Sequence, residues 1–282
     1  MKRRIRLSAW SLLPLLVCAA LANASEQAQL LAAINQYRSE SQRCGAQASE
    51  ALPPLVADAR LVLPVGGMGD LQQAMSAAGY PMVSVQAISL SGPRDAQAAL
   101  PALVDSFCQI LLDPQYVDIG ISRQDRDWRI VLARPLLGGR LGDWQAEGEK
   151  LREQINAARN QARQCGEQTF AAAAPLRWEA SLALAAESHS RAMANHNYFA
   201  HRDRDGRTPG DRAELAGYGG QRVGENIAAG RDSVDRVVEG WLASPGHCAN
   251  LMNPQFSELG AAYAVDPKSD AGIYWTALFG AP

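Results

Sequence analysis

Hydrophobic side chains recur at helical spacing in three segments of the second half of the chain. Leu151, Ile155 and Ala158 are three or four positions apart, and two later segments continue this spacing. Apolar residues at such intervals share one face of a helix. We therefore predict helices over 147–163, 179–196 and 233–242, the last of them ended by Ser244, Pro245 and Gly246.

Short apolar runs around turn residues predict two β-hairpins. One hairpin joins 259–265 to 272–279 through a turn that contains Asp266 and Pro267, and the other joins 118–122 to 128–133. The polar run 202–211 contains glycine and proline, which predicts a loop. Helices come first and strands last in each half. This order is typical of an α+β fold.

An internal repeat relates the two halves of the chain. Residues 34–63 align without a gap to residues 155–184, which brings Cys44 onto Cys165. Further on, 78–80 matches 216–218, Cys108 matches Cys248, and 113–121 matches 253–261. We predict two copies of one domain, at 25–136 and 147–282, with residues 137–146 as the linker.

The repeat also predicts how the cysteines pair. Four cysteines remain once Cys18 is set aside, and each copy holds one early and one late cysteine. The expected disulfides are Cys44–Cys108 and Cys165–Cys248. Each would close a loop long enough to contribute about 4 kcal/mol to stability in the chain-entropy description.

Residues 1–24 have the pattern of a cleaved signal peptide. A basic start is followed by the apolar run 12–21 and by Ala22-Asn23-Ala24, a small-x-small cleavage pattern. The apolar run is about half the roughly 20 residues needed to span a bilayer. We expect export to the periplasm or secretion, with no integral membrane segment after cleavage.

Composition and charge narrow the partners. With 47% hydrophobic residues over 282 positions, the chain has enough apolar residues for two small globular domains. Four of the 27 basic residues and none of the 29 acidic residues lie in 1–24, so the remainder carries 23 basic against 29 acidic groups, a charge of −6. This acidic balance argues against nucleic acid as a partner.

Several short motifs occur one after another in the second copy. They are Tyr198-Phe199-Ala200-His201, Asp205-Gly206-Arg207-Thr208-Pro209, Arg212, Val223-Gly224-Glu225-Asn226-Ile227, Trp241 with Ser244-Pro245-Gly246-His247, Asn250-Leu251-Met252, and the final Tyr274 to Gly280. With these motifs, residues 147–282 resemble the bacterial form of the CAP superfamily, whose domain is also called the SCP domain. The resemblance implies an α-β-α sandwich with a cleft lined by His201, Glu225 and His247. The family pattern has a glutamate where this chain has Ser244.

The three cleft residues suggest two kinds of chemistry. Two imidazoles and a carboxylate can ligate a divalent metal such as zinc, or Glu225 can fix the tautomer of one imidazole. Metal binding would then weaken as pH falls through the usual histidine range near 6.5. His189 and His196 are seven positions apart on a predicted helix, where packing or surface roles are favoured. Asp203 and Asp205 indicate a solvated turn rather than a calcium loop.

Two function classes remain after the motifs are compared. The sequence has no GxSxG, HExxH, P-loop or GxGxxG motif. We favour an extracytoplasmic binding module whose cleft holds a divalent metal, a small ligand, a lipid or an envelope component. The alternative is a metal-assisted hydrolase of envelope peptides or esters, with His201 and His247 as ligands and Glu225 as general base.

The first copy is expected to lack the site. It contains no histidine, Phe107 matches His247, and either Gln86 or Ala87 falls at the position of Glu225. We expect it to be a degenerate copy with a stabilising or partner-binding role.

Overall fold

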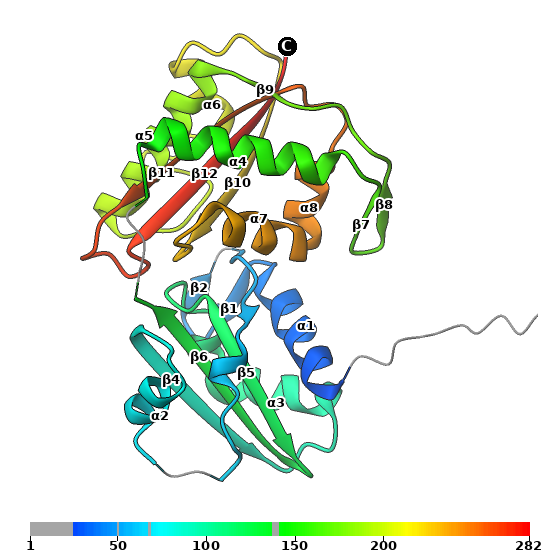
Figure 1. The fold of residues 1–282 in the computed structure, drawn as a ribbon, viewed down its shortest axis with the longest axis vertical. Coiled ribbons are helices and arrows are strands. Elements are labelled where there is room, and N and C mark those ends of the chain that lie inside the picture. The colour runs from blue at the N-terminus through cyan, green and yellow to red at the C-terminus, as the bar shows by residue number, and fades with distance from the viewer. Residues whose placement is uncertain (1–24, 50, 67–68, 137–140) are drawn as a thin grey trace, which may run out of the picture.

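The computed structural model describes residues 25–49, 51–66, 69–136 and 141–282 (Figure 1). The predicted signal peptide, and residues 137–140 of the predicted linker, lie outside the described residues. Within the described residues, no helix is both long enough and apolar enough to cross a membrane. Below, residues 25–136 are called the first half and residues 141–282 the second half.

The first half is built around a four-stranded sheet in the order β3-β5-β6-β4. β3 runs parallel to β5, and the other pairs are antiparallel. The elements in chain order are α1 (Glu26–Arg38), β1 (Gln42–Cys44), β2 (Gln47–Ser49), β3 (Val56–Ala57), the 3₁₀ helix η1 (Ala59–Leu61), α2 (Leu71–Ala77), β4 (Met82–Ser91), α3 (Ala96–Leu111), β5 (Asp118–Gln124) and β6 (Asp127–Pro135).

The second half repeats this plan with a longer helical layer. Its sheet has the order β10-β12-β11-β9, in which β9 runs parallel to β11. Its elements are α4 (Trp144–Arg159), β7 (Arg163–Cys165), β8 (Gln168–Phe170), β9 (Arg177–Trp178), α5 (Ala180–His196), α6 (Pro209–Leu215), β10 (Arg222–Ala229), α7 (Val234–Ala243), α8 (Pro245–Met252), β11 (Glu258–Val265) and β12 (Ile273–Ala281).

Helices cover both faces of the second sheet, which gives the expected α-β-α sandwich. Trp275 and Phe279 of β12 pack with α4, α7 and α8, whereas Leu278 packs with Leu182 of α5. Successive strand residues point to opposite faces, so one strand serves both layers. All residues of β12 except Ala281 are buried for this reason. Figure 1 shows α4 across the sheet of the upper half.

Several sequence-based predictions of secondary structure need correction. α4 ends at Arg159 instead of residue 163, because Arg163–Cys165 pairs with Gln168–Phe170 in a tight hairpin. The predicted loop 202–211 includes the start of α6, where Thr208 and Asp211 form a capping box. Helix α5, helix α7 and the β11–β12 and β5–β6 hairpins form as predicted, to within a few residues.

Both predicted disulfides are present. Cys44 is bonded to Cys108 with a Cα–Cα distance of 5.7 Å, and Cys165 is bonded to Cys248 with a Cα–Cα distance of 5.4 Å. The first bridge ties the β1–β2 hairpin to α3, and the second ties the β7–β8 hairpin to α8.

Matched positions of the two halves make the same contacts. The guanidinium of Arg38, 1% exposed, donates to the carbonyls of Leu111 and Tyr116, and that of Arg159, 0% exposed, donates to those of Leu251 and Phe256. Two further contacts are shared. The Asn35 side chain bonds the backbone of Leu55, and the Asn156 side chain bonds that of Leu176 in the same way. The Tyr80 hydroxyl donates to Asp118, and the Tyr218 hydroxyl donates to Glu258.

A buried ion cluster joins the two halves. Asp118 of β5 is 0% exposed and accepts hydrogen bonds from Arg231 at 3.1 Å and from Arg236 at 2.5 Å. Arg231 also donates to the carbonyl of Pro54 at 2.8 Å.

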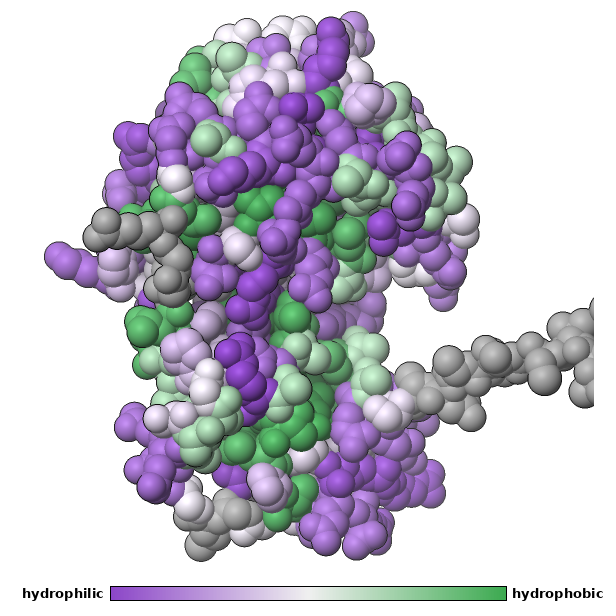
Figure 2. Space-filling model, in the orientation of Figure 1, coloured by the Kyte–Doolittle hydropathy of each residue, from purple (hydrophilic) through white to green (hydrophobic). Residues whose placement is uncertain are grey.

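On the face shown in Figure 2, the second half is mostly hydrophilic, and hydrophobic surface gathers on the first half.

Candidate functional site

Glu225 lies at the centre of the candidate site, on β10. Its Oε1 is 2.8 Å from Nδ1 of His201, and its Oε2 accepts a hydrogen bond from Nη2 of Arg212 at 2.5 Å. The Glu225 side chain is 1% exposed, whereas that of His201 is 41% exposed. Both carboxylate oxygens are therefore engaged, while the imidazole they hold reaches solvent.

Arg212 of α6 fixes the loop that carries His201. Its Nη1 donates to the carbonyl of His201 at 2.9 Å and to that of Arg207 at 3.0 Å. One guanidinium thereby connects the loop, helix α6 and β10. The capping box at Thr208 starts α6 at the point that brings Arg212 under the loop.

His247 belongs to a neighbouring arrangement on α8. Its Nδ1 is 2.9 Å from Oγ of Ser244, and its backbone carbonyl accepts a hydrogen bond from the Asn226 amide at 3.1 Å. Burial, followed by the nearby charge of His201, lowers the pKa of His247 to about 4. The ring is therefore neutral at neutral pH.

The three predicted residues meet only in part. Glu225 and Asn226 are consecutive on a strand and point to opposite faces, so Glu225 reaches His201 and Asn226 reaches α8. Among the residues that the structure describes, no group of three or more His, Cys, Asp or Glu side chains is placed to hold a metal ion. The structure thus forms a His201–Glu225 pair, with His247 close enough for its pKa to respond to the charge of His201.

Two members of the site were not among the predicted site residues. Arg212 appeared in the sequence only as one motif position, and Ser244 only as a departure from the family pattern. The i, i+3 spacing of Ser244 and His247 is a local signal that could have indicated their contact. Arg212 and Glu225 are 13 positions apart in sequence, a separation that gives no such signal.

The other residues considered from the sequence lie outside the His201–Glu225 pair. His189 is buried on α5, with Nε2 2.9 Å from the carbonyl oxygen of Ala200, and His196 is exposed. Asp203 accepts backbone hydrogen bonds from Asp205 and Arg207, which makes a turn closed on itself. In the first half, the pairing register places Ala87 opposite Val131, as Glu225 lies opposite Leu278, so Ala87 rather than Gln86 occupies the corresponding strand position.

Comparisons with known proteins find relatives for part of this chain. Residues 153–279 match the sequence profile of the cysteine-rich secretory protein family, CAP. The YkwD protein of Bacillus subtilis is 33% identical over 105 residues, and the membrane protein YlbC of the same organism is 38% identical over 95 residues. These matches cover 37% and 34% of this chain, and the chain spans only 39% and 27% of the two relatives.

A solved structure of an extracellular protein containing an SCP domain, from Bacillus anthracis, is 19% identical with a TM-score of 0.42. The match covers 76% of this chain and 72% of that one. Residues 153–279, in the second half of the chain, are thus similar to the cysteine-rich secretory protein (CAP) family.

Proposed function

We propose that the chain is an extracytoplasmic binding protein whose CAP domain binds its ligand at His201. The observation that carries this proposal is the pairing of Glu225 with His201 and Arg212. A carboxylate accepts, so Nδ1 of His201 carries a hydrogen, and Nε2 is the ring nitrogen left to bind a ligand. An exposed imidazole with a fixed tautomer suits ligand or metal binding.

A divalent ion such as zinc would be held by the imidazoles of His201 and His247, with Glu225 orienting His201. This revises the predicted ligand set, because both oxygens of Glu225 already accept hydrogen bonds. Neutral imidazoles are the form that binds metal, and the low pKa of His247 favours that form. The bound ion would leave coordination positions for a small ligand, a lipid or an envelope component.

The bonding of Glu225 also favours binding over hydrolysis. A metal-assisted hydrolase would need Glu225 as a general base with an oxygen free to take a proton. Here Oε1 is engaged by His201, and Oε2 by the buried cation of Arg212. These contacts of Glu225 therefore disfavour the hydrolase alternative.

The two disulfides support export to the periplasm or beyond the cell. Disulfides form and persist in oxidising compartments and are rare in the cytosol. Residues 1–24 supply the proposed signal. On this proposal the protein acts outside the cytoplasm.

We also propose that residues 25–136 are a degenerate CAP-like copy. The repeated arginine, asparagine and tyrosine contacts, the same sheet order and the matched disulfides support it. Ala87 and Phe107 stand where the second half has Glu225 and His247. The first half would then serve as a stabilising or partner-binding domain that lacks the ligand residues.

Calorimetric titration of the metal-free protein with zinc tests the binding proposal. We expect His201→Ala and His247→Ala each to remove most of the affinity. Glu225→Gln, which alters an orienting group, should weaken binding by about 10- to 100-fold. His196→Ala changes an exposed histidine outside the site and should bind zinc as the wild type does.

Two outcomes would refute the metal proposal. One is an absence of zinc binding by the wild type at neutral pH. The other is equal affinity of the wild type and both site-histidine variants, which would place the zinc elsewhere.

A further inference from the structure

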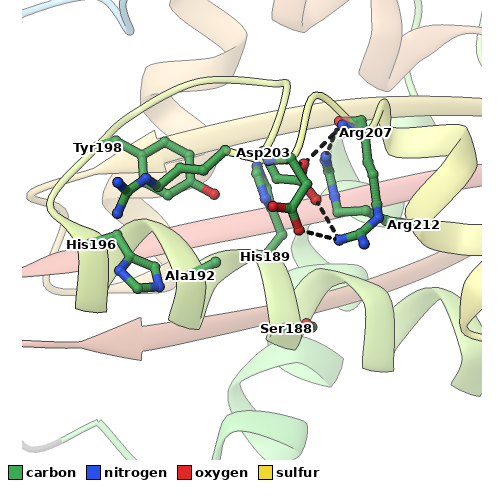
Figure 3. A pocket seen from close by; sticks show the side chains of 10 residues that line it. Ser188, His189, Ala192, His196, Tyr198, Asp203, Arg207 and Arg212 are labelled. Carbon is green, nitrogen blue, oxygen red and sulfur yellow. Dashed lines mark hydrogen bonds and ion pairs between the residues drawn. The ribbon is translucent and has the colours of Figure 1, made fainter.

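A cavity lies beside the site, between α5 and the segment that runs from Tyr198 to Arg212. Its volume is about 440 Å³, and Figure 3 shows the side chains that line it. The polar ones that matter here are His189, Tyr198, Asp203, Arg204, Arg207 and Arg212. His201, Glu225 and His247 are not among its ten described lining residues.

Three buried polar atoms in the wall of this cavity lack a hydrogen-bond partner within the described part of the chain. They are Nδ1 of His189, the hydroxyl of Tyr198 and Nε of Arg212. His189 is 1% exposed and Arg212 is 7% exposed. A buried polar atom without a partner costs about 1–3 kcal/mol. A molecule bound in the cavity would be needed to supply the partners that the described protein atoms do not.

The state of the His189 ring defines what the ligand must offer. Nε2 lies 2.9 Å from the carbonyl oxygen of Ala200, which only accepts, so Nε2 carries the hydrogen. Burial lowers the pKa of His189 to about 4, and the ring is neutral at pH 7. Nδ1 is therefore an acceptor, whereas Nε of Arg212 is a donor and the Tyr198 hydroxyl can do either. Hydroxyl groups satisfy all three.

The charges around the cavity favour a neutral ligand. Arg207 pairs with Asp205 at 2.7 Å and with Asp203 at 3.6 Å, and Arg212 pairs with Glu225. Two of the three guanidinium groups that line the cavity are therefore paired with carboxylates, and the third, that of Arg204, is exposed. An anionic ligand would compete with carboxylates already in place.

Two aromatic rings also lie at the cavity. The rings of His189 and Tyr198 meet edge to face, with centroids 6.2 Å apart and an interplanar angle of 68°. Figure 3 shows both side chains at the cavity. A sugar has hydroxyl groups at its rim and C–H groups on its faces, and the partly exposed ring of Tyr198 is suited to contact those faces.

We propose that this cavity is a binding site for a neutral saccharide, held by His189, Tyr198 and Arg212. The site uses side chains other than the His201–His247 pair, so it goes beyond the function proposed above. Its ligand class is defined by hydroxyl groups without a formal charge.

Titration of the full-length mature protein with neutral disaccharides tests this site. Cellobiose, maltose and N,N′-diacetylchitobiose are suitable probes, and we expect at least one to bind. Tyr198→Phe keeps the ring and removes one hydroxyl partner, which should weaken binding by about 5- to 10-fold. His189→Phe removes the acceptor and should weaken it at least as much.

Tyr263→Phe is the matched control. It removes a hydroxyl that donates to the carbonyl of Gly142, at a residue that does not line this cavity, and should leave saccharide affinity unchanged. The site is wrong if Tyr198→Phe binds as tightly as the wild type. The ligand class is wrong if no neutral disaccharide binds, or if glucose 6-phosphate binds in their place. Zinc titration of the same samples reports on His201 and His247 separately, so the two proposals can fail independently.

Discussion

Arg212 shows how much of the site depends on one buried side chain. Its two terminal nitrogens bind Glu225, the carbonyl of His201 and the carbonyl of Arg207. A buried cation beside a buried carboxylate replaces the solvation that both groups lose on folding. The exposed His201 ring therefore rests on a support that is itself only 7% exposed at Arg212 and 1% exposed at Glu225.

Burial of His189 predicts a loss of stability in acid. Its pKa is lowered to about 4 in the folded protein, against an ordinary value near 6.5, mainly by desolvation. The unfolded chain therefore takes up the proton first, so the free energy of unfolding decreases as pH falls from about 6.5 to about 4. The shift corresponds to a contribution on the order of 3 kcal/mol. Urea unfolding of the wild type and His189→Gln at several pH values measures it.

The variant should show a flatter dependence on pH across that window. His196→Gln is the control, since this side chain is exposed and should leave the wild-type pH dependence in place. Parallel curves for wild type and His189→Gln would show that the buried imidazole does not cause the acid sensitivity.

At the scale of elements, the sequence predicted what local spacing encodes. Helix α5 and the β11–β12 hairpin follow from residues close together in the chain. Strand β10 did not, because Gly224, Glu225 and Asn226 have low strand propensity and are held by eight paired positions of β12. The His201–Glu225 contact was suggested by the family resemblance, whereas the contact of Asn226 with α8 depends on side-chain alternation along β10.

Because α5 lies close to β11, we predict that position 260 requires glycine. A Cβ at this position would lie 2.0 Å from the backbone nitrogen of Ala183, an atom that cannot move without shifting the helix. We expect Gly260→Ala to reduce the free energy of unfolding by about 3 kcal/mol or more. Chemical denaturation followed by circular dichroism measures the change.

Gly246→Ala is the matched control for this substitution. No atom lies within 4 Å of the added Cβ among the described residues, and its φ is not in the left-handed region. We expect a change within about 0.5 kcal/mol, typical of a surface site. A Gly260→Ala protein as stable as this control would mean that the helix–strand spacing can relax.

At the scale of the molecule, the two halves are joined by a desolvated ion cluster. Asp118 belongs to the first half, and its guanidinium partners belong to the loop after β10 and to α7 of the second half. The corresponding acid of the second half, Glu258, keeps the tyrosine contact but pairs with Arg177, whose side chain is 71% exposed. Glu258 thus makes its contacts within its own half, whereas Asp118 joins the two halves.

This difference predicts unequal effects of neutralising the two acids. Asp118→Asn leaves Arg231, 1% exposed, without its counter-ion, and breaking a buried pair costs about 3–5 kcal/mol. Glu258→Gln removes a partly solvated pair, for which about 1 kcal/mol is expected. Urea unfolding gives both values, and hydrogen exchange of the α7 amides should accelerate in Asp118→Asn only, because Arg236 lies on that helix. Equal destabilisation by the two variants, or unchanged exchange in α7, would show that the cluster does not couple the first half to the domain that carries the site.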